Sequence, residues 1–218
     1  MGNLPPKNIF FPQGKIGNLV FYTLNGKTVV RTRPGGSHKN KTHPSKLQLL
    51  QREKLKTINQ FLKPLKQVLD FGYQEFLTQS KKGIHLAYSE LNHKGYNHDR
   101  NPKIDPAFLK ISKGSLLEPQ NAFFERVDSG IRIHWSNNSD EGKSRSSDEA
   151  FIVLYQPDAE KYIWIKDQFK RSDGLAEINL SEANGNFPWH IYFAFSQFNS
   201  WKKSYTLSNS IYLGKLVL

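Results

Sequence analysis

Apolar and polar residues alternate near the start of the chain in two runs, Ile16–Leu24 and Lys27–Arg33. They flank Asn25-Gly26, a dipeptide typical of tight hairpin turns because both positions must tolerate positive φ. We therefore predict a β-hairpin. Gly14 and Gly17 lack the spacing of a phosphate-binding loop and predict a bulge or a close approach of the backbone instead.

Apolar residues recur at helical spacing from Ser45, a suitable N-cap, to about residue 70. Pro64 predicts a kink or a second helix. The residues between the apolar positions give this segment a positive face, which is more often solvated than a binding surface; they are Lys46, Arg52, Lys54, Lys56, Lys63 and Lys66. The preceding residues 34–46 are basic and contain Gly and Pro, which predicts a loop that orders on binding.

Residues 71–106 are punctuated by Gly and Pro, which predicts a turn or two of helix and a linker. From residue 107 the pattern changes to alternation with regular turn signals. The predicted strands are Phe108–Ser112, Ala122–Val127, Ile131–Trp135, Ala150–Gln156, Tyr162–Lys166, Leu175–Leu180, Trp189–Phe195 and Ser208–Leu218. We predict an α+β protein, with a hairpin and helical region (1–106) followed by an immunoglobulin-like or fibronectin-III-like antiparallel β-sandwich (107–218).

Several aromatic residues of the β-rich part are candidates for the core. Trp135 shares a strand face with Ile131 and Ile133, and Tyr192 is its expected packing partner. The polar segment 137–149 is predicted to be a long loop without further role. Three other aromatic residues would form either a binding surface or, as strand aromatics more often do, part of the core; these are Trp164, Trp201 and Tyr205.

The formal net charge of +12 arises entirely from the first part of the chain. Residues 1–82 contain 15 Lys and Arg against three acidic residues, whereas residues 83–218 contain 16 of each sign. Such asymmetry indicates an anionic partner for the N-terminal region, although a positive surface also serves solubility.

Other features of the sequence exclude several classes of protein. The chain contains no cysteine, so disulfides, thiol catalysis and thiolate metal sites are excluded. Its apolar runs, such as Ile191–Phe195, are far shorter than the roughly 20 residues that span a bilayer. The N-terminus lacks the pattern of a secretory signal. We expect synthesis in the cytoplasm, no membrane partner and no cofactor.

The segment from Ile131 to the end resembles a fibronectin type III domain. The resemblance rests on Trp135 in an early strand, on the apolar strand Trp189–Phe195, and on the serines that precede the last strand, Ser204, Ser208 and Ser210. It implies a binding or spacer module rather than an enzyme.

Nearly the whole chain also resembles an uncharacterised bacterial family, a domain of unknown function. The matching residues are Gly14-Lys-Ile-Gly-Asn18, Asn25-Gly-Lys27, Val29-Val-Arg31, Gln51-Arg52, Phe61-Leu62, Pro64-Leu65 and Ile111-Ser-Lys-Gly114. The resemblance implies a cargo protein carried inside extracellular contractile injection systems, phage-tail-like particles that would release or deliver it.

Familiar catalytic motifs do not occur in the sequence, including the nucleophile elbow, the His-Glu-x-x-His zinc motif and the phosphate-binding loop. The one tight group of potential metal ligands is His93, His98 and Asp99, but a polar loop with incidental histidines explains this segment better, because two of the expected ligands are unaccounted for. The acidic pairs Asp140-Glu141 and Asp148-Glu149 lack ligand spacing.

These observations favour a non-catalytic binding or cargo protein that docks on an acidic protein surface, such as the inner tube of a contractile injection system. The docking surface is predicted to contain Lys15, Lys27, Arg31, Arg33, Lys39, Lys41, Lys46 and Arg52. Two alternatives stay open. One is a nucleic-acid-binding protein in which Phe21 and Tyr22 stack on bases, and the other is a delivered toxin with an unrecognised active site.

Overall fold

In the computed structural model, two tight turns with positive φ connect three strands of the first sheet. Asn25 (φ 51°) and Gly26 (φ 75°) join β3 (Leu19–Leu24) to β4 (Lys27–Thr32), which confirms the predicted hairpin. Gly17 (φ 56°) begins a second turn, which joins β2 (Gly14–Ile16) to β3. The predicted bulge is therefore wrong, because the run Ile16–Leu24 reverses direction at Gly17-Asn18.

The structure describes residues 2–3, 13–33, 44–95, 104–128, 130–180 and 187–217. Their contacts fall into two compact units, residues 1–52 and 53–218. The smaller unit contains an antiparallel sheet of order β1-β4-β3-β2, with β1 formed by Gly2–Asn3. This division falls at residues 52/53, and the predicted domain boundary at 106/107 stays a prediction.

The predicted helical segment forms α2 (Lys46–Leu62) and α3 (Lys66–Gly72), interrupted at Pro64 as expected. Ser45 caps α2, because its Oγ accepts the Gln48 N–H at 3.3 Å and its own N–H donates to Gln48 Oε1 at 3.0 Å. A third helix, α4 (Gly83–Lys94), is longer than the predicted turn or two. No helix in the described part of the chain is long and apolar enough to cross a membrane.

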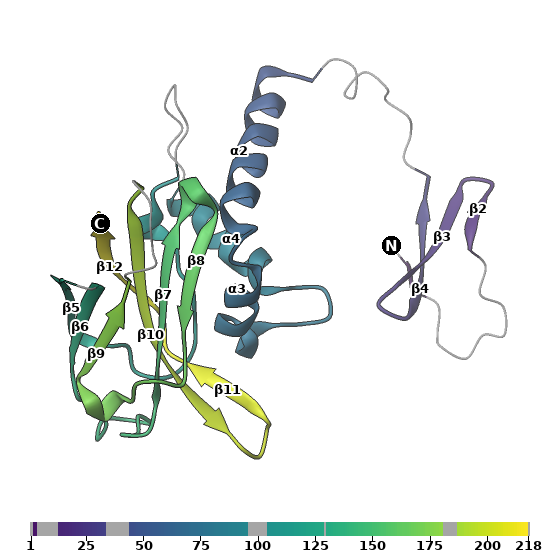
Figure 1. Ribbon diagram of the computed structural model, residues 1–218. Coiled ribbons are helices and arrows are strands. Elements are labelled where there is room, and N and C mark those ends of the chain that lie inside the picture. Colours follow the sequence, from purple (N-terminus) through teal and green to yellow (C-terminus); the bar gives the residue numbers. More distant parts are fainter. Residues whose placement is uncertain are drawn as a thin grey trace. The chain divides into compact units, whose positions relative to one another are not determined.

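The sandwich consists of two antiparallel sheets (Figure 1). One has the order β5-β6-β9 and the other the order β11-β10-β7-β8, with β12 also paired to β10. The strands are β5 (Gln120–Val127), β6 (Gly130–Ser136), β7 (Glu149–Gln156), β8 (Lys161–Ile165), β9 (Leu175–Asn179), β10 (Trp189–Asn199), β11 (Ser204–Leu207) and β12 (Ile211–Leu216). The result is a mixed α+β protein that contains a sandwich-like pair of sheets.

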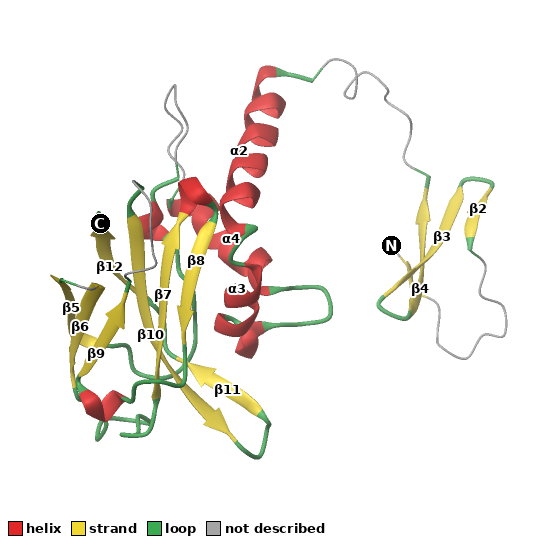
Figure 2. Ribbon diagram, viewed as in Figure 1, coloured by secondary structure: helices red, strands yellow, loops and turns green. Residues whose placement is uncertain are grey.

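The larger sheet separates two apolar cores, because alternate residues of β7 and β10 point to opposite faces. Ile191, Phe193 and Phe195 pack towards the smaller sheet, while Tyr192 and Ala194 pack towards the helices. The helices lie along one face of the sheet (Figure 2). Trp135 therefore contacts Phe193 and Phe195, with ring centroids 5.1 and 6.0 Å away, and the expected partner Tyr192 is wrong by one position.

Two predicted strands also differ from the structure. Phe108–Ser112 pairs with no other strand among the described residues; instead Pro106–Phe108 forms a short 3-10 helix, η2. The N–H groups of Ile111 and Ser112 donate to the Ser210 hydroxyl at 2.9 and 3.3 Å. The predicted strand Ser208–Leu218 is present in shorter form as β12, and β11, which precedes it and also pairs with β10, was not predicted.

Candidate functional site

The small N-terminal sheet brings several of the predicted basic residues onto one face. Lys15 lies opposite Val20, which lies opposite Arg31, and residues that face each other across antiparallel strands share a face. Lys27 is on the same face as Arg31, because the two are four positions apart in one strand. We call Lys15, Lys27 and Arg31 the basic sheet face.

All three cations of the basic sheet face are exposed, and no described carboxylate forms an ion pair with them. Lys15 and Arg31 are separated by two strand spacings, about 10 Å. The Arg31 guanidinium lies 5.7 Å from the centroid of the Tyr22 ring, which belongs to the same face. Arg33 is exposed just beyond β4, where its N–H donates to the Asn18 carbonyl at 2.7 Å. The face therefore offers unpaired positive charge beside one aromatic ring.

The other predicted basic residues do not all join this group. Lys46 and Arg52 are exposed on the first turns of α2, whereas Lys39 and Lys41 lie outside the described residues. Lys54 is buried, and its ammonium donates to the Asn92 carbonyl at 2.8 Å. This lysine belongs to the contact between α2 and α4, so the positive face predicted for the helical segment is smaller than expected.

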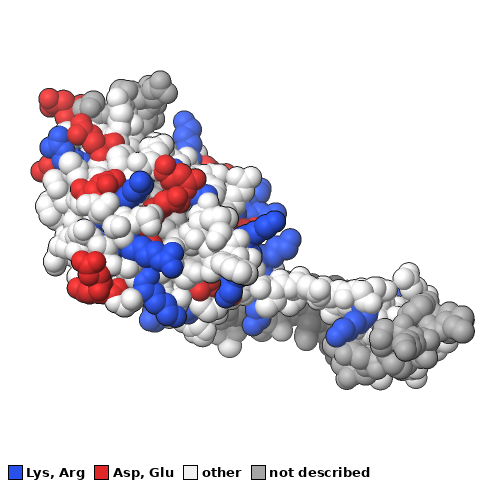
Figure 3. Space-filling view, turned by 90° about the horizontal axis from the view of Figure 1, so that it is seen from below, with Lys and Arg blue, Asp and Glu red and all other residues white. Residues whose placement is uncertain are grey.

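Cations and carboxylates alternate over the larger unit, in contrast to the basic sheet face. The view in Figure 3 shows blue and red residues interspersed on the body of this unit. Arg132, for example, bridges Glu125 and Glu177 at 3.2 Å each, and Lys113 pairs with Glu90 at 3.2 Å. Charge is therefore largely compensated locally on the sandwich.

The suggested metal site receives no support from the geometry that the structure describes. His98 and Asp99 lie outside the described residues, and His93 is exposed near the end of α4. Within the described ranges, no group of three or more His, Asp or Glu side chains is arranged to hold a metal.

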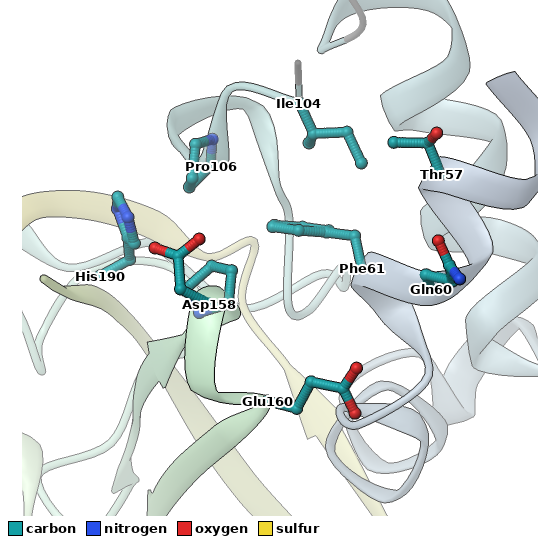
Figure 4. A pocket seen from close by; sticks show the side chains of 9 residues that line it. Thr57, Gln60, Phe61, Ile104, Pro106, Asp158, Glu160 and His190 are labelled. Carbon is teal, nitrogen blue, oxygen red and sulfur yellow. The ribbon is translucent and has the colours of Figure 1, made fainter. Parts of the chain in front are cut away.

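A pocket of about 620 Å³ lies between α2, the segment before η2 and one end of the larger sheet. Figure 4 shows Asp158 beside His190 on one side, with Phe61 forming the middle of the wall. The remaining lining residues are Thr57, Gln60, Ile104, Pro106, Pro157 and Glu160. Of the described residues that line it, none is a lysine or an arginine.

His190 is held in a defined orientation at the edge of this pocket. Its Nδ1 lies 2.8 Å from the Tyr212 hydroxyl, and the two rings are stacked. Burial lowers the pKa of His190, while the nearby carboxylates of Asp105 and Asp158 act in the opposite direction. The pocket thus combines an imidazole whose pKa is lowered by burial with the carboxylates of Asp158 and Glu160. Sequence reasoning missed it because its residues come from segments more than 100 positions apart.

A second feature that the sequence did not reveal is a carboxyl pair next to the sandwich. Burial, a hydrogen bond from the protonated Glu149 carboxyl to Asp167 and the charge of Asp167 raise the pKa of Glu149 to about 7, although Lys166 and Lys170 oppose the shift. Lys166 and Asp167 also form an ion pair at 3.3 Å. Glu149 is the first residue of β7, and Asp167 follows shortly after the end of the neighbouring strand β8.

This pair predicts a pH-dependent stability. The folded protein retains the Glu149 proton up to about pH 7, whereas the unfolded chain releases it near the ordinary pKa of 4.5. Because the folded state binds more protons in that window, the free energy of unfolding falls as pH rises from 5 to 7. Glu149→Gln should therefore raise the melting temperature more at pH 8 than at pH 5. An equal effect at both values, or the same pattern in the exposed control Glu53→Gln, would contradict this explanation.

Comparison with known proteins adds one match. A family model described as a family of unknown function (DUF6266) matches residues 11–214, which is most of the chain. No curated protein and no solved structure matches the chain significantly.

Proposed function

Since the chain belongs to this family of unknown function, we propose from its own residues that it is a non-catalytic binding protein. The basic sheet face is the attachment surface, its partner is an acidic protein surface, and the sandwich with its helices forms a stable body. The observation that carries the proposal is the placement of Lys15, Lys27 and Arg31 on one face, with no carboxylate of the described residues paired to them.

The binding free energy that such a surface supplies is modest and depends on the salt concentration. Each exposed ion pair is worth about 0.2–1 kcal/mol, so a few cations contribute mainly to the rate and orientation of association. An apolar side chain adds to the surface available for binding, because Val20 lies between Lys15 and Arg31 and is only partly buried. We expect reversible binding that weakens as ionic strength rises.

The body is proposed to be a fibronectin-III-like module. If β11 and β12 are taken together as the last strand, the first, second and fifth strands form one sheet and the other four form the second. This strand order is that of fibronectin type III domains, and the central position of Trp135 in the core between the sheets is in keeping with it. Such modules serve as rigid supports for binding surfaces.

The specific form of the proposal is cargo of an extracellular contractile injection system, docked on an acidic inner tube. Support comes from the concentration of net charge in residues 1–82 and from the family resemblance. Co-purification of the protein with such a particle, and its loss on charge reversal of the basic sheet face, is the direct test.

A simpler test separates the basic sheet face from net charge alone. The variant Lys15→Glu/Arg31→Glu is expected to bind immobilised polyglutamate about tenfold or more weakly than the wild type. The matched control Lys161→Glu/Lys215→Glu makes the same change in net charge at exposed positions of the sandwich. It should lose much less affinity. Equal losses in both variants would show that net charge, and not this face, determines binding.

Nucleic acid is the second candidate, because Tyr22 lies beside Arg31 on the basic sheet face. Phe21 points to the opposite face, so only one of the two suggested aromatic residues is placed for stacking there. Stacking of a base on an aromatic ring is worth about 1–3 kcal/mol. Tyr22→Leu should therefore weaken binding to single-stranded DNA about tenfold while leaving polyglutamate binding unchanged, if nucleic acid is the partner.

A further inference from the structure

The hairpin of β10 and β11 presents a fully exposed tryptophan at its tip. Trp201 is 96% exposed, in a turn that joins Asn199 to Ser204. The hairpin extends beyond the end of the sandwich (Figure 1). Large aromatic side chains are normally buried in large part, so this exposure requires an explanation.

The turn itself holds Trp201 outward. Asn199 Oδ1 accepts the backbone N–H groups of Trp201 and Lys202, both at 3.1 Å. Lys203 adopts a left-handed conformation with φ 47°, which lets the chain enter β11. Because these contacts fix the backbone on both sides of the indole, its exposure is a property of the turn rather than of a loose end.

The base of the hairpin is anchored to the body. Tyr205 packs against Phe198 and Phe71, with both centroid distances 5.1 Å. The Lys166 ammonium lies 4.2 Å from the Tyr205 ring centroid and donates to its hydroxyl at 3.1 Å. The Tyr205 N–H donates to Gln74 Oε1 at 3.1 Å. Rigid anchoring of this kind allows the tip to enter a partner without loss of order.

The chemistry of the tip is an indole flanked by two ammonium groups. Lys202 and Lys203 are exposed, and no carboxylate of the described ranges pairs with either. Phe198, at the start of the turn, is 51% exposed and adds apolar surface on one side of the hairpin. The tip therefore suits a partner that accepts an aromatic ring and is negatively charged.

The shape of the tip selects among such partners. A stable protein–protein interface buries about 800 Å² on each side, which a single convex turn does not supply. A lipid surface deforms around a protruding side chain, and tryptophan resides at the depth of the headgroups, where its ring and its N–H are both accommodated. Adjacent lysines are attracted to anionic headgroups.

We propose that the Trp201-Lys202-Lys203 tip of the β10–β11 hairpin inserts into the headgroup region of a membrane surface that carries anionic lipids. This site is separate from the basic sheet face and does not depend on the function proposed for that face. The tip accounts for shallow, reversible attachment and not for spanning of the bilayer. The proposal therefore departs from the expectation of no membrane partner, which was argued from apolar runs too short to span a bilayer.

Intrinsic fluorescence of the full-length protein can test this site selectively. Trp135 and Trp189 are buried and Trp164 is partly buried, so a change in emission on adding vesicles reports mainly on Trp201. We expect a blue shift with vesicles of phosphatidylcholine and phosphatidylserine, quenching by brominated acyl chains, and a much smaller effect with phosphatidylcholine alone. The charge reversal Lys202→Glu/Lys203→Glu should weaken partitioning about tenfold or more.

Two controls make the result specific to the tip. Lys161→Glu/Lys215→Glu changes net charge equally and should retain the blue shift, as should Lys15→Glu/Arg31→Glu, which removes the basic sheet face. Trp201→Ser should abolish the shift while the near-ultraviolet circular dichroism of the folded protein is preserved. The proposal is overturned if anionic vesicles cause no shift in the wild type, or if the shift persists in Lys202→Glu/Lys203→Glu. It is equally overturned if Trp201-dependent binding is found with polyglutamate and not with vesicles, which would indicate an acidic protein as the partner.

Discussion

Replacement of Arg171 by methionine is expected to reduce the free energy of unfolding by about 3–5 kcal/mol, the typical effect of removing one partner of a buried ion pair. Arg171 is fully buried, and its Nε lies 3.1 Å from Asp148 Oδ2. Its other guanidinium nitrogens donate to Asn138 Oδ1 and, at 3.1 Å, to the Leu117 carbonyl. Methionine fills much of the volume but leaves all three oxygens without these donors.

The surroundings of Arg171 explain why the loss cannot be relieved by water. The guanidinium lies 3.8 Å from the centroid of the Phe195 ring, in the apolar core between the two sheets. The backbone carbonyl of Arg171 also accepts the indole N–H of Trp135 at 2.9 Å. Arg171 therefore links the polar loop 137–149 to both sheets, through its guanidinium at Phe195 and through its carbonyl at Trp135.

Urea denaturation at constant m-value is the appropriate measurement. The exposed neighbour Lys170→Met is the control and should change stability by no more than about 0.5 kcal/mol. In a double-mutant cycle, Arg171→Met/Asp148→Asn should be less destabilised than the sum of the single variants, because the second change removes the unpaired charge. Additive effects, or a loss below about 1 kcal/mol for Arg171→Met, would show that the pair is not a main source of stability.

Elements with a strong local signal were predictable from the sequence. Asn25-Gly26 determines a turn by its own backbone preferences, and the alternation of Ile131–Trp135 identifies a strand with one buried face. Alternation also places Lys27 and Arg31 on one side of β4. The position of Lys15 on that same side depends on the turn at Gly17. The sequence predicted a bulge there, because a glycine in a strand pattern is compatible with a bulge and with a turn.

Features that depend on distant partners were not predictable. Phe108–Ser112 has the composition of a strand, but the hydroxyl of Ser210, about 100 positions away, takes its N–H groups. The polar segment 137–149 appeared to be a plain loop, whereas Asn138 and Asp148 are buried against Arg171. The exposure of Trp201 also depends on the geometry of its turn. Tyr205, an aromatic residue four positions further on in β11, is half-buried instead.

The segment Ile111–Gly114, which is part of the family resemblance, connects the helices to the sandwich. Ile111 belongs to the core on the helical side, and the Ser112 hydroxyl donates to the Ser208 carbonyl at 2.9 Å. Gly114 follows at a point where a Cβ would overlap the Leu207 carbonyl and Glu75 Oε1. Glu75 Oε1 also accepts the Leu207 N–H at 2.8 Å, which satisfies the free edge of β11.

Gly114→Ala is accordingly expected to lower the free energy of unfolding by about 3 kcal/mol, at the upper end of overpacking effects. The atom that such a Cβ would meet first is the Leu207 backbone carbonyl oxygen, so β11 or the 111–114 segment would have to move. This movement would strain the hydrogen bonds of the Leu207 N–H to Glu75 and of the Leu116 N–H to the Leu207 carbonyl. The neighbouring exposed control Ser115→Ala should stay within about 1 kcal/mol. Hydrogen exchange should show the loss of protection centred on β11 and η1 (Gln74–Phe76). A Gly114→Ala protein as stable as the wild type would mean that this close approach is not needed to hold the helices on the sheet.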